Sequence, residues 1–267
     1  MRIATYNVNG IGARLPRLLE WLDETRTDIV CLQELKAPDE RFPEAEIAAL
    51  GYNAVWHGQK SWNGVAILAR GMDIDLRGKG LPNDPDESHS RYIEAEIGGV
   101  IVGGLYLPNG NPIPGPKFDY KIAWFNALLD HARSLFETER PTVLAGDWNV
   151  IPTDSKNDVF SAGRMANDAL AQPESRSCFA RLNHAGWTDA IRAIHPKEQV
   201  YTFWDYTMNA WARDAGFRID HLMLSPAAAD RLIEAGVDKE YRGREKASDH
   251  APTWIRISPD RLSQTTS

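Results

Sequence analysis

The chain has 267 residues, 43% of them hydrophobic and 25% charged, and a formal net charge of −7. This composition is typical of globular proteins, the length suits one large domain or two small ones, and no run approaches the ~20 apolar residues of a membrane span. The negative charge argues against non-specific binding of nucleic acid over the whole surface, although it leaves room for a local basic face.

Short apolar runs recur along the chain, with turn residues and amphipathic stretches between them. Runs of four to eight such residues predict strands, and apolar spacings of three and four residues predict helices. The elements alternate too irregularly for a strict βαβ protein, and they include helices that an all-β protein lacks. We therefore predict a layered α/β fold, with sheets in the middle and helices outside. In chain order we expect a strand at 3–8, helix 15–22, strand 29–32, helix 44–50, strands 65–68, 92–97 and 100–107, helix 119–136, strand 143–145, helix 178–194, and strands 219–224 and 254–257.

No linker or low-complexity block divides the chain, so we expect one domain over residues 1–257, followed by a polar tail at 258–267. The first residues show no apolar signal core and lead directly into a strand pattern. The two cysteines are Cys31, inside an apolar run, and Cys178. Isolated cysteines without a secretion signal indicate a reducing compartment, and we expect the cytoplasm.

The stretch from Val143 to Asn149 is the most informative part of the sequence. A short buried strand stops at Gly146, and Asp147 and Asn149 follow at a spacing of two. On an extended backbone alternate side chains point the same way. A carboxylate beside a carboxamide is able to hold a water, a metal ion or a phosphate, whereas the plainer interpretation of the same residues is a turn.

Other predicted strands also end or begin with polar side chains. Carboxylates and carboxamides gathered at strand ends predict a site for a hard cation such as Mg²⁺, which prefers oxygen ligands. Glu34 is the main candidate, with Asp249 and Asn7. Zinc is a poorer fit because no histidine–cysteine cluster has the required spacing. The residues at these strand ends are Asn7, Asn9, Gln33, Glu34, Tyr106, Asn109, Asp147, Asn149, Asp220, Asp249 and His250.

His250 needs a carboxylate partner from elsewhere, because neighbouring residues on a strand point to opposite faces and Asp249 is therefore unsuited. Asp220 is the candidate. Each residue also has a plain interpretation: Asp220 in an ion pair with Arg218, Glu34 as a helix cap, and His250 as a satisfied loop histidine. The functional interpretation therefore depends on the whole set.

The set as a whole resembles the exonuclease III / apurinic-apyrimidinic endonuclease family, within the endonuclease/exonuclease/phosphatase superfamily. The resemblance runs in order from Met1 to about Ile257. It implies a four-layer α/β sandwich, in which two mixed β-sheets pack face to face between flanking helices, with the active site where strand ends converge. The motifs that carry it are Asn7 and residues 32–34, 105–109, 146–149, 218–220 and 248–250.

The resemblance also implies roles for individual residues. Glu34 is the main ligand of Mg²⁺, for which Mn²⁺ can substitute, and Asp249 and Asn7 contribute. Asp147 positions or deprotonates the attacking water and Asn149 orients it. His250, held by Asp220, contacts the scissile phosphate. Tyr106 and Asn109 face that phosphate, while Asp147, Asn149 and His250 also belong to the metal site.

The segment from Tyr201 to Asp220 interleaves aromatic residues with arginines, a composition that suits nucleic acid distorted at a lesion. The resemblance implies that its apolar side chains wall a pocket for a base-less sugar. The plainer interpretations are a loop packed on the sheet and, for the basic residues, ordinary solvated charges. The candidate substrate-binding residues are Phe203, Trp211, Phe217 and Ile219 in the segment, and Arg91, Lys117 and Lys121 for phosphates.

We therefore expect a Mg²⁺-dependent DNA-repair phosphodiesterase that acts as a monomer on double-stranded DNA. It would cut 5′ to abasic sites and remove nucleotides or blocking groups from 3′ ends. One alternative is a superfamily phosphoesterase for RNA, a nucleotide, an inositol phosphate or a lipid head group, which the aromatic loop and the basic rim at Lys117 and Lys121 disfavour. The other is a non-catalytic DNA-binding module, which would need no such set of carboxylates.

Overall fold

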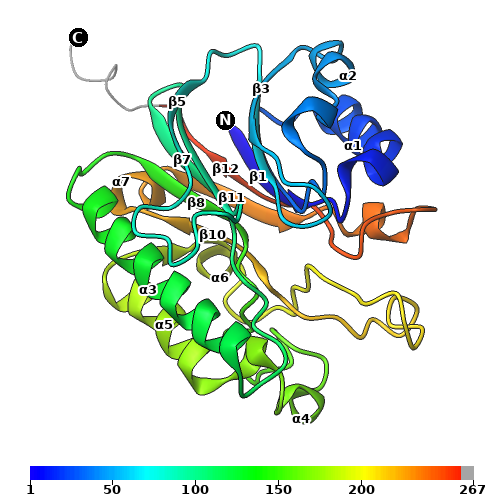
Figure 1. Ribbon diagram of the computed structural model, residues 1–267, viewed down its shortest axis with the longest axis vertical. Coiled ribbons are helices and arrows are strands. Elements are labelled where there is room, and N and C mark those ends of the chain that lie inside the picture. Colours follow the sequence, from blue (N-terminus) through cyan, green and yellow to red (C-terminus); the bar gives the residue numbers. More distant parts are fainter. Residues whose placement is uncertain (260–267) are drawn as a thin grey trace.

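Two six-stranded sheets form the centre of the molecule in the computed structural model, which describes residues 1–259 (Figure 1). The first sheet has the strand order β11-β12-β1-β2-β4-β3, and the second has the order β5-β6-β7-β8-β10-β9. The strands are β1 (Arg2–Asn7), β2 (Ile29–Gln33), β3 (Tyr52–His57), β4 (Val65–Arg70), β5 (Asp75–Lys79), β6 (Tyr92–Ile97), β7 (Val100–Tyr106), β8 (Thr142–Asp147), β9 (Thr188–Asp189), β10 (Asp220–Leu224), β11 (Leu232–Val237) and β12 (Thr253–Ile257).

Both sheets are mixed. Strand β1 runs parallel to β2, and β7 runs parallel to β8, whereas their other neighbours pair antiparallel. A parallel pair needs a long crossover, and helices α1 and α3 supply the two crossovers. The helices are α1 (Ile11–Thr25), α2 (Glu44–Ala48), α3 (Pro116–Phe136), α4 (Ala162–Met165), α5 (Pro173–His184), α6 (Ala190–Ile194) and α7 (Pro226–Ala229), with short 3₁₀ turns at Asp39–Arg41, Ala169–Ala171 and Lys239–Gly243.

Three apolar clusters hold four layers together. The central cluster joins the facing sides of the two sheets through residues such as Ile67 and Val102. A second cluster packs α3 and α5 on the outer face of the second sheet, and a third packs α1 and α2 on the first. Figure 1 shows these helix pairs on opposite sides of the paired sheets. The predicted four-layer α/β sandwich is confirmed.

The predicted strands and three of the four predicted helices correspond to elements of the structure, but the helix expected at residues 178–194 is wrong. Helix α5 ends at His184, and Gly186 adopts a φ of 101°, which turns the chain away from helical geometry. Asp189 then caps a separate helix, α6, by accepting a hydrogen bond from the backbone N–H of Arg192. The sequence did not reveal this break, because the apolar spacing typical of a helix continues on both sides of it.

The strands that the sequence did not reveal are β3, β5, β9 and β11, which include the edges of both sheets. Edge strands are partly solvated, so they lack the apolar runs of central strands, and β5 is mostly exposed. Both cysteines are buried and unpaired. Within residues 1–259, no helix has the length and apolarity to cross a membrane. Most of the tail predicted at 258–267 lies outside the described residues.

Candidate active site at the strand ends

Strand register aligns the polar side chains at one end of each sheet. In the first sheet Asn7 lies opposite Gln33, and Glu34 follows directly. In the second sheet Asp147 lies between Tyr106 on β7 and Asp220 on β10. The carboxyl ends of two parallel pairs, and the start of an antiparallel strand, therefore converge on one place.

Asn7 connects the two sheets at this place. Its Nδ2 donates hydrogen bonds to Glu34 Oε1 at 2.8 Å and to Asp147 Oδ2 at 2.9 Å. Its Oδ1 accepts a hydrogen bond from the backbone N–H of Asn9 at 3.0 Å, which fixes the orientation of the amide. Asn7 was expected to offer oxygen to a metal ion. In this arrangement that oxygen faces the backbone of Asn9, while the amide nitrogen bridges the two carboxylates.

His250 lies between two carboxylates. Its Nδ1 is 2.8 Å from Asp220 Oδ2, and its Nε2 is 3.7 Å from Asp147 Oδ2. All three side chains are buried. Arg218 does not pair with Asp220, because its guanidinium donates to Asp158 and Asp189. Asp220 is therefore available to orient the imidazole.

Burial and charge act together on these groups. Burial favours the neutral imidazole, but the negative charges of Asp220 and Asp147 outweigh it and raise the pKa of His250. Burial also raises the pKa of Asp147, and the charges of Asp220 and Glu34 reinforce this while His250 opposes it. For Glu34, burial is outweighed by hydrogen bonds from Asn7 and Lys36, which lower its pKa. The site thus favours a charged His250 beside an ionised Glu34.

A chain of polar contacts, which sequence reasoning missed, extends from Glu34 to Asp249. Lys36 Nζ lies 2.8 Å from Glu34 Oε2 and donates to Asn9 Oδ1 at 2.5 Å, and Asn9 Nδ2 donates to Asp249 Oδ1 at 3.0 Å. Asp249 is therefore connected to Glu34 by a chain of polar contacts through Asn9 and Lys36. The spacing of two that marks Asp147 and Asn149 also relates Asn7 to Asn9 and Glu34 to Lys36, and it was the available signal.

Asn149 lies beside Asp147, but the backbone is not extended there. Its φ is 47°, its backbone N–H donates to Asp147 Oδ1 at 2.9 Å, and its Nδ2 donates to Leu107 O at 2.9 Å. Asn109 Nδ2 in turn donates to Asn149 Oδ1 at 3.2 Å. The structure therefore has the turn, and this turn gathers the side-chain amides of Asn109 and Asn149 beside the carboxylate of Asp147.

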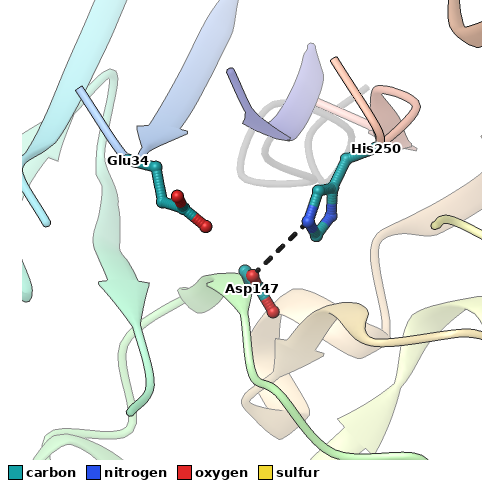
Figure 2. A group of neighbouring side chains, drawn as sticks. All are labelled: Glu34, Asp147 and His250. Atoms are coloured by element: carbon teal, nitrogen blue, oxygen red, sulfur yellow. Dashed lines mark ion pairs between the residues drawn. The ribbon is translucent and has the colours of Figure 1, made fainter. Parts of the chain in front are cut away.

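Three side chains offer ligand atoms within 4.8 Å of one another: Glu34, Asp147 and His250. Figure 2 shows Glu34 and His250 approaching Asp147 from opposite sides. Two carboxylates in a buried site supply the hard oxygen donors that divalent cations such as Mg²⁺ and Mn²⁺ require. The donor set therefore fits such an ion.

Tyr106 and Arg91 form one side of the site. The guanidinium of Arg91 lies 5.0 Å from the centre of the Tyr106 ring and donates to Tyr106 O at 3.2 Å. Burial, together with the charges of Glu34 and Asp147, raises the pKa of Tyr106 well above its ordinary value. Tyr106 therefore keeps its phenolic proton, and it is able to donate a hydrogen bond.

Phe203 and Phe217 form the other side. The Phe203 ring lies 4.9 Å from the His250 ring and 4.7 Å from the Phe217 ring, centre to centre. Backbone bridges join Phe203 to both of these residues. Ile219 is buried beneath them, in a cluster with Val159. An apolar wall thus adjoins His250 directly.

Two expected substrate contacts occupy other places. Lys121, expected to bind phosphate, is fully buried, and its ammonium donates to the backbone oxygens of Pro108, Asn109 and Asn149. It supports the turns that carry the amides instead of facing solvent. Trp211 is half-buried and packs edge-on against Trp204, with ring centres 5.1 Å apart. Lys121 is thus a packing residue, whereas Trp211 keeps part of its surface exposed.

Lys117 is exposed at the start of α3, as a phosphate contact requires. Trp148 and Trp204, two tryptophans in polar stretches of sequence, are fully buried. Core packing therefore accounts for them, and the exposed aromatic surface lies elsewhere. Among the large apolar side chains that are exposed in residues 1–259 are Trp62, Phe160, Tyr206 and Met208.

Comparisons with known proteins agree with this geometry. The chain is 30% identical to Exodeoxyribonuclease III of Haemophilus influenzae, over 96% of this chain and 100% of that protein. Its structure resembles that of a 3′ phosphatase from Neisseria bound to a product DNA hairpin, with a TM-score of 0.92, 38% identity, and coverage of 97% of this chain and 99% of that one. It also resembles an AP endonuclease from Archaeoglobus fulgidus, with a TM-score of 0.91, 34% identity, and coverage of 96% and 99%.

The sequence pattern of the Endonuclease/Exonuclease/phosphatase family matches residues 4–250, from the first strand to the histidine beside Asp147. That span includes both sheets and the polar strand ends described above. The chain therefore belongs to the endonuclease/exonuclease/phosphatase family.

Proposed function

We propose that the protein is a DNA-repair phosphodiesterase that processes DNA 3′ ends and also cuts 5′ to abasic sites. The observation that carries this proposal is the buried set of Glu34, Asp147 and His250, with Asp220 behind the histidine. Similarity to an exodeoxyribonuclease III, a 3′ phosphatase bound to DNA and an AP endonuclease supports DNA as the substrate.

Glu34 and Asp147 would hold the metal ion, which we propose is Mg²⁺ with Mn²⁺ as a substitute. Their oxygens lie close together, and Asn7 donates to both of them, so the pair is already oriented. A bound divalent ion supplies positive charge that stabilises the phosphoryl oxygens. Asp249, which is half-buried, is connected to Glu34 through Asn9 and Lys36.

The side chains around the metal site would each have one role in hydrolysis of the phosphodiester. The charged His250, oriented by Asp220, donates from Nε2 to a phosphoryl oxygen. Asp147, oriented by the amide of Asn7 and the backbone N–H of Asn149, accepts the proton of the attacking water. As water attacks, the P–O bond to the leaving oxygen breaks, and solvent protonates that oxygen. The hydroxyl of Tyr106 and the amide of Asn109 donate to the phosphate, and the amide of Asn149 orients the water.

The wall formed by Phe203 and Phe217 would accept a base-less sugar, because it is apolar and reaches His250. Arg91 and the exposed Lys117 would bind phosphates of double-stranded DNA. We further propose that the protein acts as a monomer. Its two free, buried cysteines suit the reducing environment of the cytoplasm.

A denaturing gel tests this function. The substrates are a duplex with one defined abasic site and a duplex with a recessed 3′ end, each with and without Mg²⁺. Asp147→Ala and His250→Ala should lower cleavage by orders of magnitude while DNA affinity stays within about tenfold. Matched controls are Asp130→Ala and His184→Ala, both exposed on helices of the far face. Equal cleavage by either active-site variant, or faster turnover of an inositol phosphate than of DNA, contradicts the proposal.

A further inference from the structure

A cavity of about 150 Å³ is lined in part by Phe217, whose ring contacts Phe203 beside His250. It opens between the segment 159–165 and the loop 205–217. Its lining is mainly apolar and includes Val159, Phe160, Met165, Met208, Ala210 and Phe217. An apolar cavity of roughly this volume is known to accept a single aromatic ring.

The mouth of this cavity carries exposed apolar side chains. Phe160 is 41% exposed and Met208 is 68% exposed. The backbone of Phe160 is fixed to the neighbouring loop, because its N–H donates to Gly216 O at 3.0 Å. Large exposed apolar groups grouped around a cavity mark a binding surface. A flat ring would find a preformed face of Phe160 to stack on.

Charged side chains around the cavity indicate which class of ligand it would bind. The guanidinium of Arg213 lies 5.7 Å from the centre of the Phe160 ring. Arg164 is exposed on α4, and its side chain makes no ion pair with any residue of the described range 1–259. Asp205 also lines the cavity and offers acceptor oxygens. An apolar interior with cations at the rim suits a flat heterocycle attached to phosphates, and the carboxylate suits an amino group on that heterocycle.

Phe217 links this cavity to the reaction centre, since it belongs both to the cavity lining and to the wall beside His250. Two ring contacts, of 4.7 and 4.9 Å, separate the cavity from the imidazole. Adjacent phosphates of one DNA strand are several ångströms apart. The cavity therefore lies at a distance from His250 that a nucleotide flanking a phosphate bound there could span.

We propose that the cavity receives an unstacked nucleobase from the nucleotide that flanks the reacting one. This inference rests on the proposed function, because it requires a DNA strand at His250. It assigns the segment 159–165 and the loop 205–217 to one binding surface, in which Arg164 and Arg213 hold the phosphates around the unstacked base.

The test compares duplexes that lack a flanking base with protein variants in which the cavity is filled. Ala215→Leu places a larger side chain into the cavity that Ala215 lines, and Ala212→Leu is the matched control on the same loop, exposed and outside the lining. Abasic duplexes each lack one further base, at one of the two positions on either side of the lesion. Fluorescence anisotropy in EDTA gives Kd without cleavage.

Deleting the base at one flanking position should weaken binding by the wild type about five- to 150-fold, the range for one stacked base. Ala212→Leu should show the same loss. Ala215→Leu should bind the intact duplex more weakly and lose its sensitivity to that deletion, and Phe160→Ala, a change at the surface, should do likewise.

Two results overturn the inference: a wild type indifferent to every flanking deletion, or cavity variants that keep the full sensitivity. Either is distinguishable from failure of the proposed function. If the proposed function is wrong, the wild type neither binds the intact abasic duplex nor cleaves it with Mg²⁺, and the inference is then wrong as well.

Discussion

Replacing Asp220 by asparagine isolates the role of its charge. The amide oxygen of Asn has the position and the acceptor capacity to receive the hydrogen bond from His250 Nδ1, now 2.8 Å from Asp220 Oδ2. What is lost is the negative charge of the carboxylate that raises the pKa of the buried histidine most, while Asp147, at 3.7 Å, and Asp249 remain. The pKa of His250 should therefore fall, and the neutral imidazole can no longer donate from Nε2.

Loss of general acid–base catalysis, or of the charge that orients it, lowers rates by about 10²- to 10⁴-fold. We expect kcat on an abasic duplex to fall by this factor for Asp220→Asn, while Kd for DNA in EDTA changes less than about tenfold. Single-turnover cleavage in Mg²⁺ measures the first quantity, and anisotropy measures the second. The ¹⁵N shifts of the His250 ring report its charge directly.

Glu94→Gln is the matched control. Glu94 is also a buried carboxylate, and it lies 2.7 Å from a histidine, His131, but on the outer face of the second sheet beneath α3. It should lower thermal stability without lowering kcat. A rate for Asp220→Asn within threefold of wild type would refute the reasoning, as would a His250 that remains charged at neutral pH in that variant.

Three further predictions concern support of the site, pH and metal. Lys121→Met removes a buried ammonium from three backbone oxygens, so it should lower the unfolding free energy by about 3 kcal/mol. It should leave the slope of log Kd for DNA against log salt unchanged, whereas Lys117→Met should reduce that slope by about one. The pKa of buried His221 is lowered to about 4 by burial and by Arg218. The unfolded state therefore takes up a proton first as pH falls below 6.5. Between pH 7.5 and 4.5 the wild type should lose roughly 2.5 kcal/mol of unfolding free energy that His221→Gln does not lose, measured by urea unfolding. Equal pH dependence of the two proteins would contradict this assignment. EDTA should abolish cleavage and Mg²⁺ or Mn²⁺ should restore it, and full activity in EDTA would remove the metal from the mechanism.

The central strands and the long helices were predictable because buried positions are apolar, which gives strands continuous apolar runs and helices a regular apolar spacing. Val143 and its neighbours are apolar since both faces of β8 are covered, by the other sheet and by α3. The edge strand β5 carries no such pattern, because solvent covers much of it. The break at Gly186 was missed because apolar residues continue on both sides of it.

The site was predictable to the level of residue type. Polar groups at strand ends indicated a shared site, but not which atom of each faces the centre. Asn7 was expected to offer its oxygen, and only the contact with the backbone of Asn9 shows that its nitrogen faces inward. Lys121 looks from sequence like any helical lysine, and its burial depends on where the distant turns at Pro108 and Asn149 lie.

Asn7 also bears on how activity appears as the chain folds. It is the residue whose side chain bonds Glu34 of the first sheet and Asp147 of the second, which lie 27 and 140 positions away in the sequence. Neither half-site is complete until the two sheets dock, so a refolding chain should regain nuclease activity only at that step and not when either sheet forms. The time course of recovered cleavage during refolding therefore reports when the two sheets dock, because the contact between Asn7 and Asp147 forms at that step.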